Sequence, residues 1–81
     1  MSVENKLKFL MRDVGKSRSD IAEALKISEA AVSNKFYRDS FSAEDLIKIA
    51  ECLGFELALV NDNKKIIFDM NDIKLNSKPD G

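Results

Sequence analysis

The 81-residue chain has few of the residues on which most enzyme and metal sites depend. It contains no histidine, and its single cysteine, Cys52, has no neighbouring base that would activate it as a nucleophile. The same shortage leaves no ligand set for zinc or iron and excludes an internal disulfide framework. The three glycines lie too far apart to form a phosphate-binding loop. We therefore expect no enzymatic activity, no metal and no cofactor.

Long hydrophobic runs are also absent. No apolar run approaches the roughly 18 residues that a membrane-spanning helix needs. The N-terminal sequence MSVENKLKF lacks the apolar core of a secretory signal peptide, and a lone thiol fits the reducing cytosol. These features predict a cytoplasmic protein without a membrane partner. The length predicts one small domain, and the 44% of hydrophobic residues suffices for one core.

The charge of the chain is nearly balanced but unevenly distributed. The net charge is −1 at pH 7, and the isoelectric point is about 5.4. Residues 1 to 41 carry eight cations against six acids, a net charge of +2. Residues 42 to 81 carry five lysines against eight acids, a net charge of −3. This asymmetry is weak, but it suits a protein with one side that faces a nucleic acid.

Residues 17 to 38 (SRSDIAEALKISEAAVSNKFYR) form the stretch around which the rest of the chain is organised. Ser17 and Asp20 have the spacing of a capping box, which marks the start of a helix. The apolar stripe that follows consists of Ile21, Ala22 and Leu25. This pattern predicts a helix over residues 18 to 25. Ala22 is small enough to let a second helix cross closely.

A second helix is predicted over residues 29 to 37, directly after a tight turn. Ser28 precedes it and can cap its first free N–H groups. Val32 and Phe36 lie one turn apart and give this helix an apolar face. The hydrogen-bonding and cationic residues without a core role are Ser33, Asn34, Lys35 and Arg38. We expect these side chains to point outward.

Helical patterns also cover residues 4 to 14 and residues 43 to 53. The residues expected to face inward are Leu7, Leu10, Met11, Val14, Leu46, Ile49, Ala50 and Leu53. After Gly54 the period changes from helical to alternating, which predicts a β-hairpin over residues 55 to 70. The polar residues 71 to 81 are expected to form a flexible tail.

The order of these features resembles the helix-turn-helix of the Cro and phage-repressor (XRE-type) family, over roughly residues 5 to 60. The residues that carry the resemblance are Ile21, Ala22, Leu25, Ile27, Ser28 and Val32. It implies a mainly α fold, a four-helix repressor-like domain at residues 1 to 70, here ending in a hairpin where the family usually has another helix. The family usually has glycine where this chain has Lys26, which predicts either a different bend or a strained lysine with positive φ. It often has an acidic residue in place of Phe36.

The resemblance implies a sequence-specific regulator that binds double-stranded DNA, more readily a repressor than an activator, with the helix at residues 29 to 37 in the major groove. The implied contacts to base edges are Glu29, Ala30, Ser33 and Asn34. The implied contacts to phosphate are Ser17, Arg18, Lys35 and Arg38. A homodimer is expected, because paired units of this size usually read two half-sites.

Several of these features have a plainer structural explanation. Glu29 also complements the helix dipole, Ala30 has high helix propensity, and the cations can form an ordinary solvated face. Tyr37 either stacks on a sugar–phosphate edge or covers the helix at residues 43 to 53. The hairpin either mediates the dimer or closes the bottom of the core.

A protein-binding module is the alternative function. The same fold could hold a protein partner, as an antitoxin or a phage-encoded inhibitor would. The acidic isoelectric point, about 5.4, favours this alternative. The two functions differ in salt dependence, because a protein that binds several DNA phosphates loses affinity steeply as salt rises.

Overall fold

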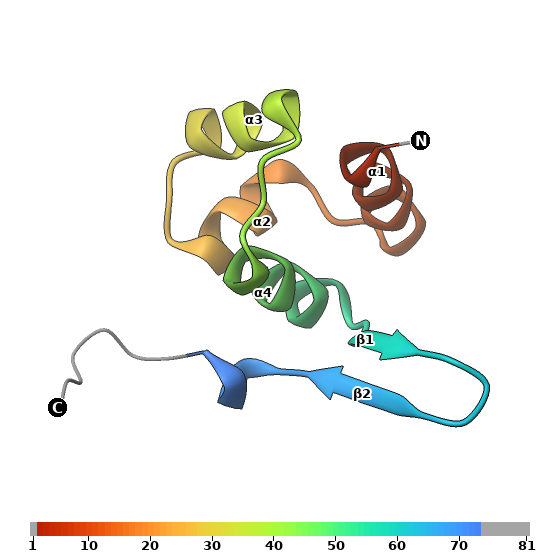
Figure 1. Ribbon diagram of the computed structural model, residues 1–81. Helices are drawn as coiled ribbons and strands as arrows, with labels where there is room; N and C mark the ends of the chain where they lie inside the picture. The colour runs from red at the N-terminus through yellow and green to blue at the C-terminus, as the bar shows by residue number, and fades with distance from the viewer. Residues whose placement is uncertain (1, 74–81) are drawn as a thin grey trace, which may run out of the picture.

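The computed structural model describes residues 2 to 73, so the predicted tail lies outside the described residues from residue 74 onward. Four helices are followed by a two-stranded antiparallel hairpin and a short 3-10 helix (Figure 1). The elements are α1 (Val3–Val14), α2 (Arg18–Leu25), α3 (Glu29–Arg38), α4 (Ala43–Leu53), β1 (Leu57–Val60), β2 (Lys65–Phe68) and η1 (Met70–Asp72). The predicted mainly α fold with a terminal hairpin is confirmed. No helix described between residues 2 and 73 is long and apolar enough to cross a membrane.

A serine occupies the N-cap position of each of the four helices. These serines are Ser2, Ser17, Ser28 and Ser42. The hydroxyl oxygen of Ser28 accepts a hydrogen bond from the backbone N–H of Ala31 at 3.1 Å. At the start of α2, the Asp20 carboxylate accepts from the Ser17 backbone N–H at 2.8 Å and from its hydroxyl at 3.2 Å. The helix starts are therefore fixed by local sequence, as the capping pattern predicts.

Each of the four helices ends at a residue in the left-handed conformation. These residues are Gly15, Lys26, Asp39 and Gly54. Lys26 has φ +60°, so of the two expected outcomes the structure shows the strained lysine with positive φ. The next N–H, from Ile27, donates to the carbonyl of Ala22 at 3.1 Å. This pair of features closes α2 and sets the direction in which the chain enters α3.

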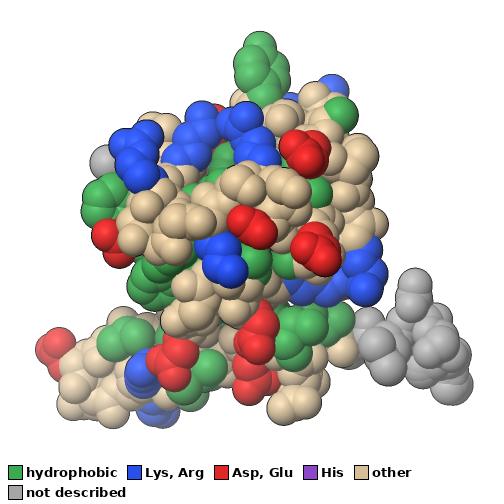
Figure 2. Space-filling model, turned by 180° about the vertical axis from the view of Figure 1, so that it is seen from behind, with side chains coloured by type: hydrophobic (Ala, Val, Ile, Leu, Met, Phe, Trp, Pro, Cys, Tyr) green, Lys and Arg blue, Asp and Glu red, His purple; other side chains and the backbone are tan. Residues whose placement is uncertain are grey.

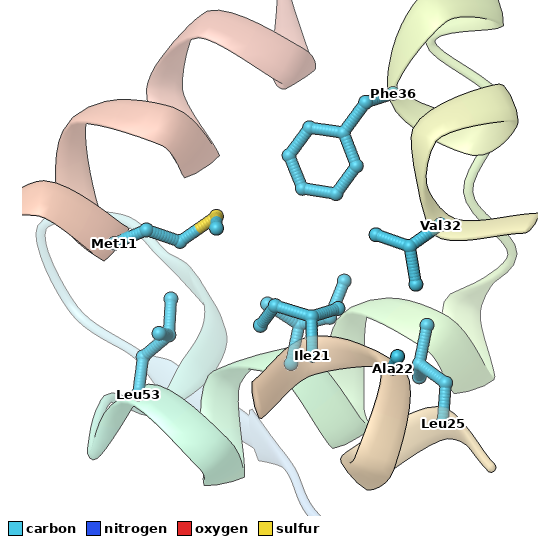
Figure 3. Packing of buried hydrophobic residues seen from close by; sticks show 8 residues of the cluster. Met11, Ile21, Ala22, Leu25, Val32, Phe36 and Leu53 are labelled. Carbon is cyan, nitrogen blue, oxygen red and sulfur yellow. The ribbon is translucent and has the colours of Figure 1, made fainter. Parts of the chain in front are cut away.

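The helix α2 forms the middle layer of the helical body, with α3 packed on one side and α4 on the other (Figure 1). The core cluster of buried residues is Met11, Ile21, Ala22, Leu25, Val32, Phe36, Ile49 and Leu53. Figure 3 shows side chains from α1, α2, α3 and α4 that converge on one centre. Ala22 is buried, in agreement with its predicted role as a small residue where helices cross.

The inward faces of α1 and α4 differ from the predicted stripes at two positions. Val14 was expected inward but is 39% exposed at the last position of α1, three residues after the buried Met11. Ile47 was not expected inward but is buried. It lines a groove between α4 and the hairpin, a packing partner that the helical period alone does not locate.

The hairpin lies against α4 on the side away from α3 (Figure 1). Its register pairs Leu57 with Phe68 and Leu59 with Ile66, so these four side chains share one face. Part of that face borders α4 and forms an apolar groove of about 310 Å³. Toward the turn the apolar residues are uncovered, and Leu59 and Val60 are 67% and 68% exposed.

The strained turn after α2 gives the first test. We expect Lys26→Gly to raise the free energy of unfolding by about 0.5–1 kcal/mol, because glycine adopts positive φ without a steric cost. Asp39→Gly relieves a similar φ of +54° but removes the oxygen that accepts from the Glu4 N–H at 2.7 Å, so it should give no gain. Urea unfolding of both variants measures this, and a Lys26→Gly protein less stable than wild type would contradict the left-handed turn.

Candidate nucleic-acid interface

The orientation of α3 determines which of its side chains face solvent. Val32 and Phe36 are 0% and 1% exposed and point into the core. With 3.6 residues per turn, Asn34, Ala30 and Arg38 lie opposite this pair, followed by Tyr37 and Ala31 at equal angles from it. Ala31 is half-buried, whereas Ala30, Asn34, Tyr37 and Arg38 are exposed. We call these four residues the outer face of α3.

The four predicted base-contacting residues all lie on α3, but not at equivalent places. Ala30 and Asn34 belong to the outer face and are exposed. Glu29 is exposed at the first position after the cap, where its carboxylate complements the helix dipole. Ser33 is half-buried and lies toward the same flank as Glu29. The four therefore cover one contiguous side of α3, with Ala30 and Asn34 farther from the core and Ser33 and Glu29 toward one flank.

Ser17 and Arg18, two of the predicted phosphate contacts, lie at the start of α2 and are exposed. The guanidinium carbon of Arg18 lies 5.6 Å from the centroid of the Phe36 ring, a cation–π contact. This contact holds the guanidinium group of Arg18 beside α3. The hydrogen bond from the Ser17 backbone N–H is the main reason that the pKa of Asp20 lies below its usual value.

Lys35 lies in an ion pair that the sequence did not reveal. Its Nζ is 2.9 Å from Oδ2 of Asp45 on α4, and the two side chains are 33% and 14% exposed. The same carboxylate oxygen accepts from the Ser42 backbone N–H at 3.0 Å. Lys35 thus ties α3 to the start of α4. Its predicted contact to phosphate would compete with this pair.

Arg38 differs from Lys35 in its surroundings. It lies at the end of α3, it is exposed, and none of the ion pairs found within residues 2 to 73 involves it. Figure 2 shows several Lys and Arg side chains gathered on the upper part of the molecule, with acidic side chains among the helices as well, and side chains of both charges near the hairpin below. Arg38 is therefore available to a negatively charged ligand at the end of α3.

Cys52 behaves as a packing residue. It is half-buried against the core cluster, and its Sγ donates a long hydrogen bond of 3.8 Å to the carbonyl of Asp20. Burial raises the pKa of the thiol, which keeps it protonated at neutral pH. Among residues 2 to 73 there is no group of three His, Cys, Asp or Glu side chains that could hold a metal ion.

The exposure of Tyr37 excludes the structural role considered for it from the sequence. The sequence left open whether it covers the helix at residues 43 to 53, but its side chain is 86% exposed, so the covering role is wrong. Tyr37 lies seven residues after Ala30 and three after Asn34, a spacing that places all three on one side of a helix. This spacing could have indicated from the sequence that Tyr37 belongs with the candidate site.

The Lys35–Asp45 pair gives a pH-dependent prediction. Burial is the largest influence on Asp45 and raises its pKa, but Lys35 and Ser42 together outweigh it, so the pKa lies below its usual value of 3.8. The stabilisation is therefore present at neutral pH and is lost as the pH falls through the folded-state pKa. We expect Asp45→Asn to lower the free energy of unfolding at neutral pH by about 1 kcal/mol.

Urea unfolding across the pH range measures this effect. The difference between wild type and Asp45→Asn should shrink as the pH falls below about 4. Glu44→Gln is the matched control, because Glu44 pairs with Lys48 on the same helix at 2.9 Å but is 51% exposed, and its loss should matter less. A difference that stays constant from neutral to acidic pH would show that the pair does not contribute.

Comparison with known proteins bears on this site. The chain matches the bacteriophage CI repressor helix-turn-helix domain over residues 10–65. It is also similar to the repressor protein CI of Enterobacteria phage phi80, with 38% identity over 56 residues. That match covers 69% of this chain and 24% of the relative, so the chain spans about a quarter of that repressor's length. No solved structure matches the chain. The resemblance read from residues 17 to 38 is confirmed, and the chain belongs to the bacteriophage CI repressor helix-turn-helix domain family.

Proposed function

We propose that the protein is a sequence-specific repressor of transcription that binds double-stranded DNA with α3 in the major groove. The observation that carries this proposal is the outer face of α3, held toward solvent because Val32 and Phe36 are buried. Membership of the phage CI repressor domain family supports it. An α-helix fits the major groove, which is about 12 Å wide. With its lone thiol, the protein would act in the cytoplasm.

The proposed contacts to bases follow from the chemistry of the side chains. Asn34 can donate to and accept from one adenine, so it is the main residue that would determine sequence choice. Glu29 can accept from the amino group of cytosine, and Ala30 can contact a thymine methyl group. Ser33 can bond to several bases and would add little discrimination.

The proposed contacts to phosphate set affinity more than sequence choice. Arg18 and Arg38 are exposed cationic residues at the start of α2 and the end of α3. Ser17 lies beside the N-terminus of α2, where the helix dipole favours an anion. Lys35 would bind phosphate only by leaving Asp45, so we rank it below the two arginines.

We further propose that the protein forms a homodimer through its hairpin. Leu59, Val60, Ile66 and Ile67 are all more than 40% exposed on this hairpin, and a two-stranded sheet alone is marginally stable in water. A two-fold contact needs one surface that can pair with itself. Among residues 2 to 73 the two apolar strands pair only with each other, which meets that need. The hairpin lies away from α3 (Figure 1), so pairing there would leave the outer face free.

Protein binding by an antitoxin-like or inhibitor-like module is the competing function, and the same exposed hairpin favours it. Selection of random duplex DNA on the protein, read by sequencing, separates the two functions. Enrichment of one motif supports the repressor. Failure to bind any duplex at low salt would contradict the DNA-binding proposal and leave the protein-binding module.

Two substitutions test the proposed roles at the interface. Asn34→Ala should reduce discrimination between the selected motif and a changed base pair by about 10- to 100-fold, because a bidentate base contact is lost. Arg38→Ala should weaken binding to all duplexes alike and reduce the slope of log affinity against log salt by about 0.9. Fluorescence anisotropy with labelled duplexes measures both. If Asn34→Ala keeps the wild-type preference, the proposed orientation of α3 in the groove is wrong.

The dimer proposal has its own test. We expect the wild type to dimerise with rising concentration, and Leu59→Glu to shift it toward monomer, because a buried, unpaired carboxylate opposes the apolar contact. Lys64→Gln, which lowers the net charge by the same one unit at the exposed turn, is the control and should keep the dimer. Sedimentation velocity measures the distribution. A wild type that stays monomeric at every concentration would contradict this proposal.

A further inference from the structure

The exposed aromatic ring on α3 is the strongest feature that the proposed contacts leave unused. Tyr37 is 86% exposed, more than any other large hydrophobic or aromatic residue described as exposed between residues 2 and 73. In the same part of the chain, the aromatic pair and the cation–π contact both involve Phe36. The core and its rim are therefore built around Phe36, and Tyr37 is directed away from both.

Tyr37 lies in line with two of the proposed base contacts on α3. Ala30, Asn34 and Tyr37 are spaced i, i+4 and i+7, so they form one line on the outer face of α3. Seven residues of helix span about 10 Å, which is close to the width of the major groove. An α3 that presents Ala30 and Asn34 to base edges thus brings the ring of Tyr37 to the far end of the same groove.

The chemistry of this side chain fits that place. A tyrosine offers a flat apolar ring that can pack on a sugar or a thymine methyl group, and it loses little conformational entropy on binding because it has two rotatable bonds. Arg38 follows Tyr37 directly and is exposed at the end of α3, where it could hold the neighbouring phosphate. Ring and cation would then engage one stretch of DNA backbone together.

We propose that Tyr37 is a DNA contact residue, whose ring packs against the sugar–base edge at the end of the site read by α3. This inference rests on the proposed function, because it requires α3 to lie in the groove. It adds a residue that neither the base contacts nor the phosphate contacts include. It also assigns the ring, not the hydroxyl, as the group that matters most.

The composition of the chain provides a direct optical test. The protein has one tyrosine and no tryptophan, so the emission excited at wavelengths that its phenylalanines do not absorb comes from Tyr37 alone. We expect the selected duplex to quench this emission, with the same midpoint that fluorescence anisotropy gives for binding. N-acetyltyrosinamide mixed with the same duplex corrects for absorption by DNA. Emission that stays unchanged at saturating duplex would overturn the proposal, although the proposed function would stand.

A relocated tyrosine is the matched control. Phe9 on α1 is 65% exposed, so the double variant Phe9→Tyr with Tyr37→Phe moves the single tyrosine to another exposed helix position. This protein should bind within about threefold of wild type, because the ring at position 37 is kept, and its emission should not change on binding. Equal quenching from position 9 would show that the signal does not report a contact, and would overturn the inference.

Affinity measurements complete the test. Tyr37→Ala should weaken binding of the selected duplex by about tenfold or more, while Phe9→Ala should change it by less than about twofold. Tyr37→Phe should stay within about threefold of wild type. Circular dichroism checks that each variant is folded. A Tyr37→Ala protein with wild-type affinity, or a Tyr37→Phe protein as weak as Tyr37→Ala, overturns the ring contact. If the wild type binds no duplex at all, this inference and the proposed function fail together.

Discussion

The packing of Val32 and Phe36 against α2 is the contact on which the rest of the structure depends. Both side chains are almost completely removed from solvent, together with Ile21 of α2. Burial of each such side chain stabilises the fold by roughly 1.5–3 kcal/mol. Rotation of α3 about its own axis would expose this apolar pair, so the core fixes the orientation of α3. The outer face, with Asn34 near its centre, is the consequence of that burial.

Contacts at the ends of α3 hold this orientation in place. The left-handed Lys26 sets the entry into α3, and Lys35 ties its last turn to Asp45 at the start of α4. Asp39, just after α3, accepts a hydrogen bond from the Glu4 N–H at 2.7 Å and so joins α3 to α1. None of these contacts uses the outer face. The polar contacts that hold α3 involve its flanks and ends, so the outer face of α3 is available to a ligand.

Local sequence patterns predicted most of the fold. Capping serines, helical apolar periods and the change to alternation after Gly54 depend on neighbours within a few residues, and the observed elements follow them. The features that the sequence did not reveal depend on distant partners. Lys35 meets a carboxylate ten residues away, Ile47 faces a hairpin that comes later in the chain, and the exposure of Tyr37 follows from how α3 crosses the body. The roles in DNA binding remain predictions.

The helical body and the hairpin have different proposed roles. Helices α2 and α3 present the side proposed to bind DNA, and the hairpin beyond α4 presents the apolar surface proposed for self-association (Figure 1). Because α4 separates the two, occupation of one does not cover the other. The charge distribution agrees with this division, since the residues up to 41 carry a net charge of +2 and those from 42 onward −3.

The central claim is that duplex DNA binds to the outer face of α3. The most direct measurement is a titration of ¹⁵N-labelled protein with a selected duplex, followed by amide chemical shifts. The account predicts that the largest changes fall on residues 29 to 38 and at the start of α2, with small changes in α4 and the hairpin. Changes that are confined to the hairpin, while the amides of α3 stay as in the free protein, would contradict it.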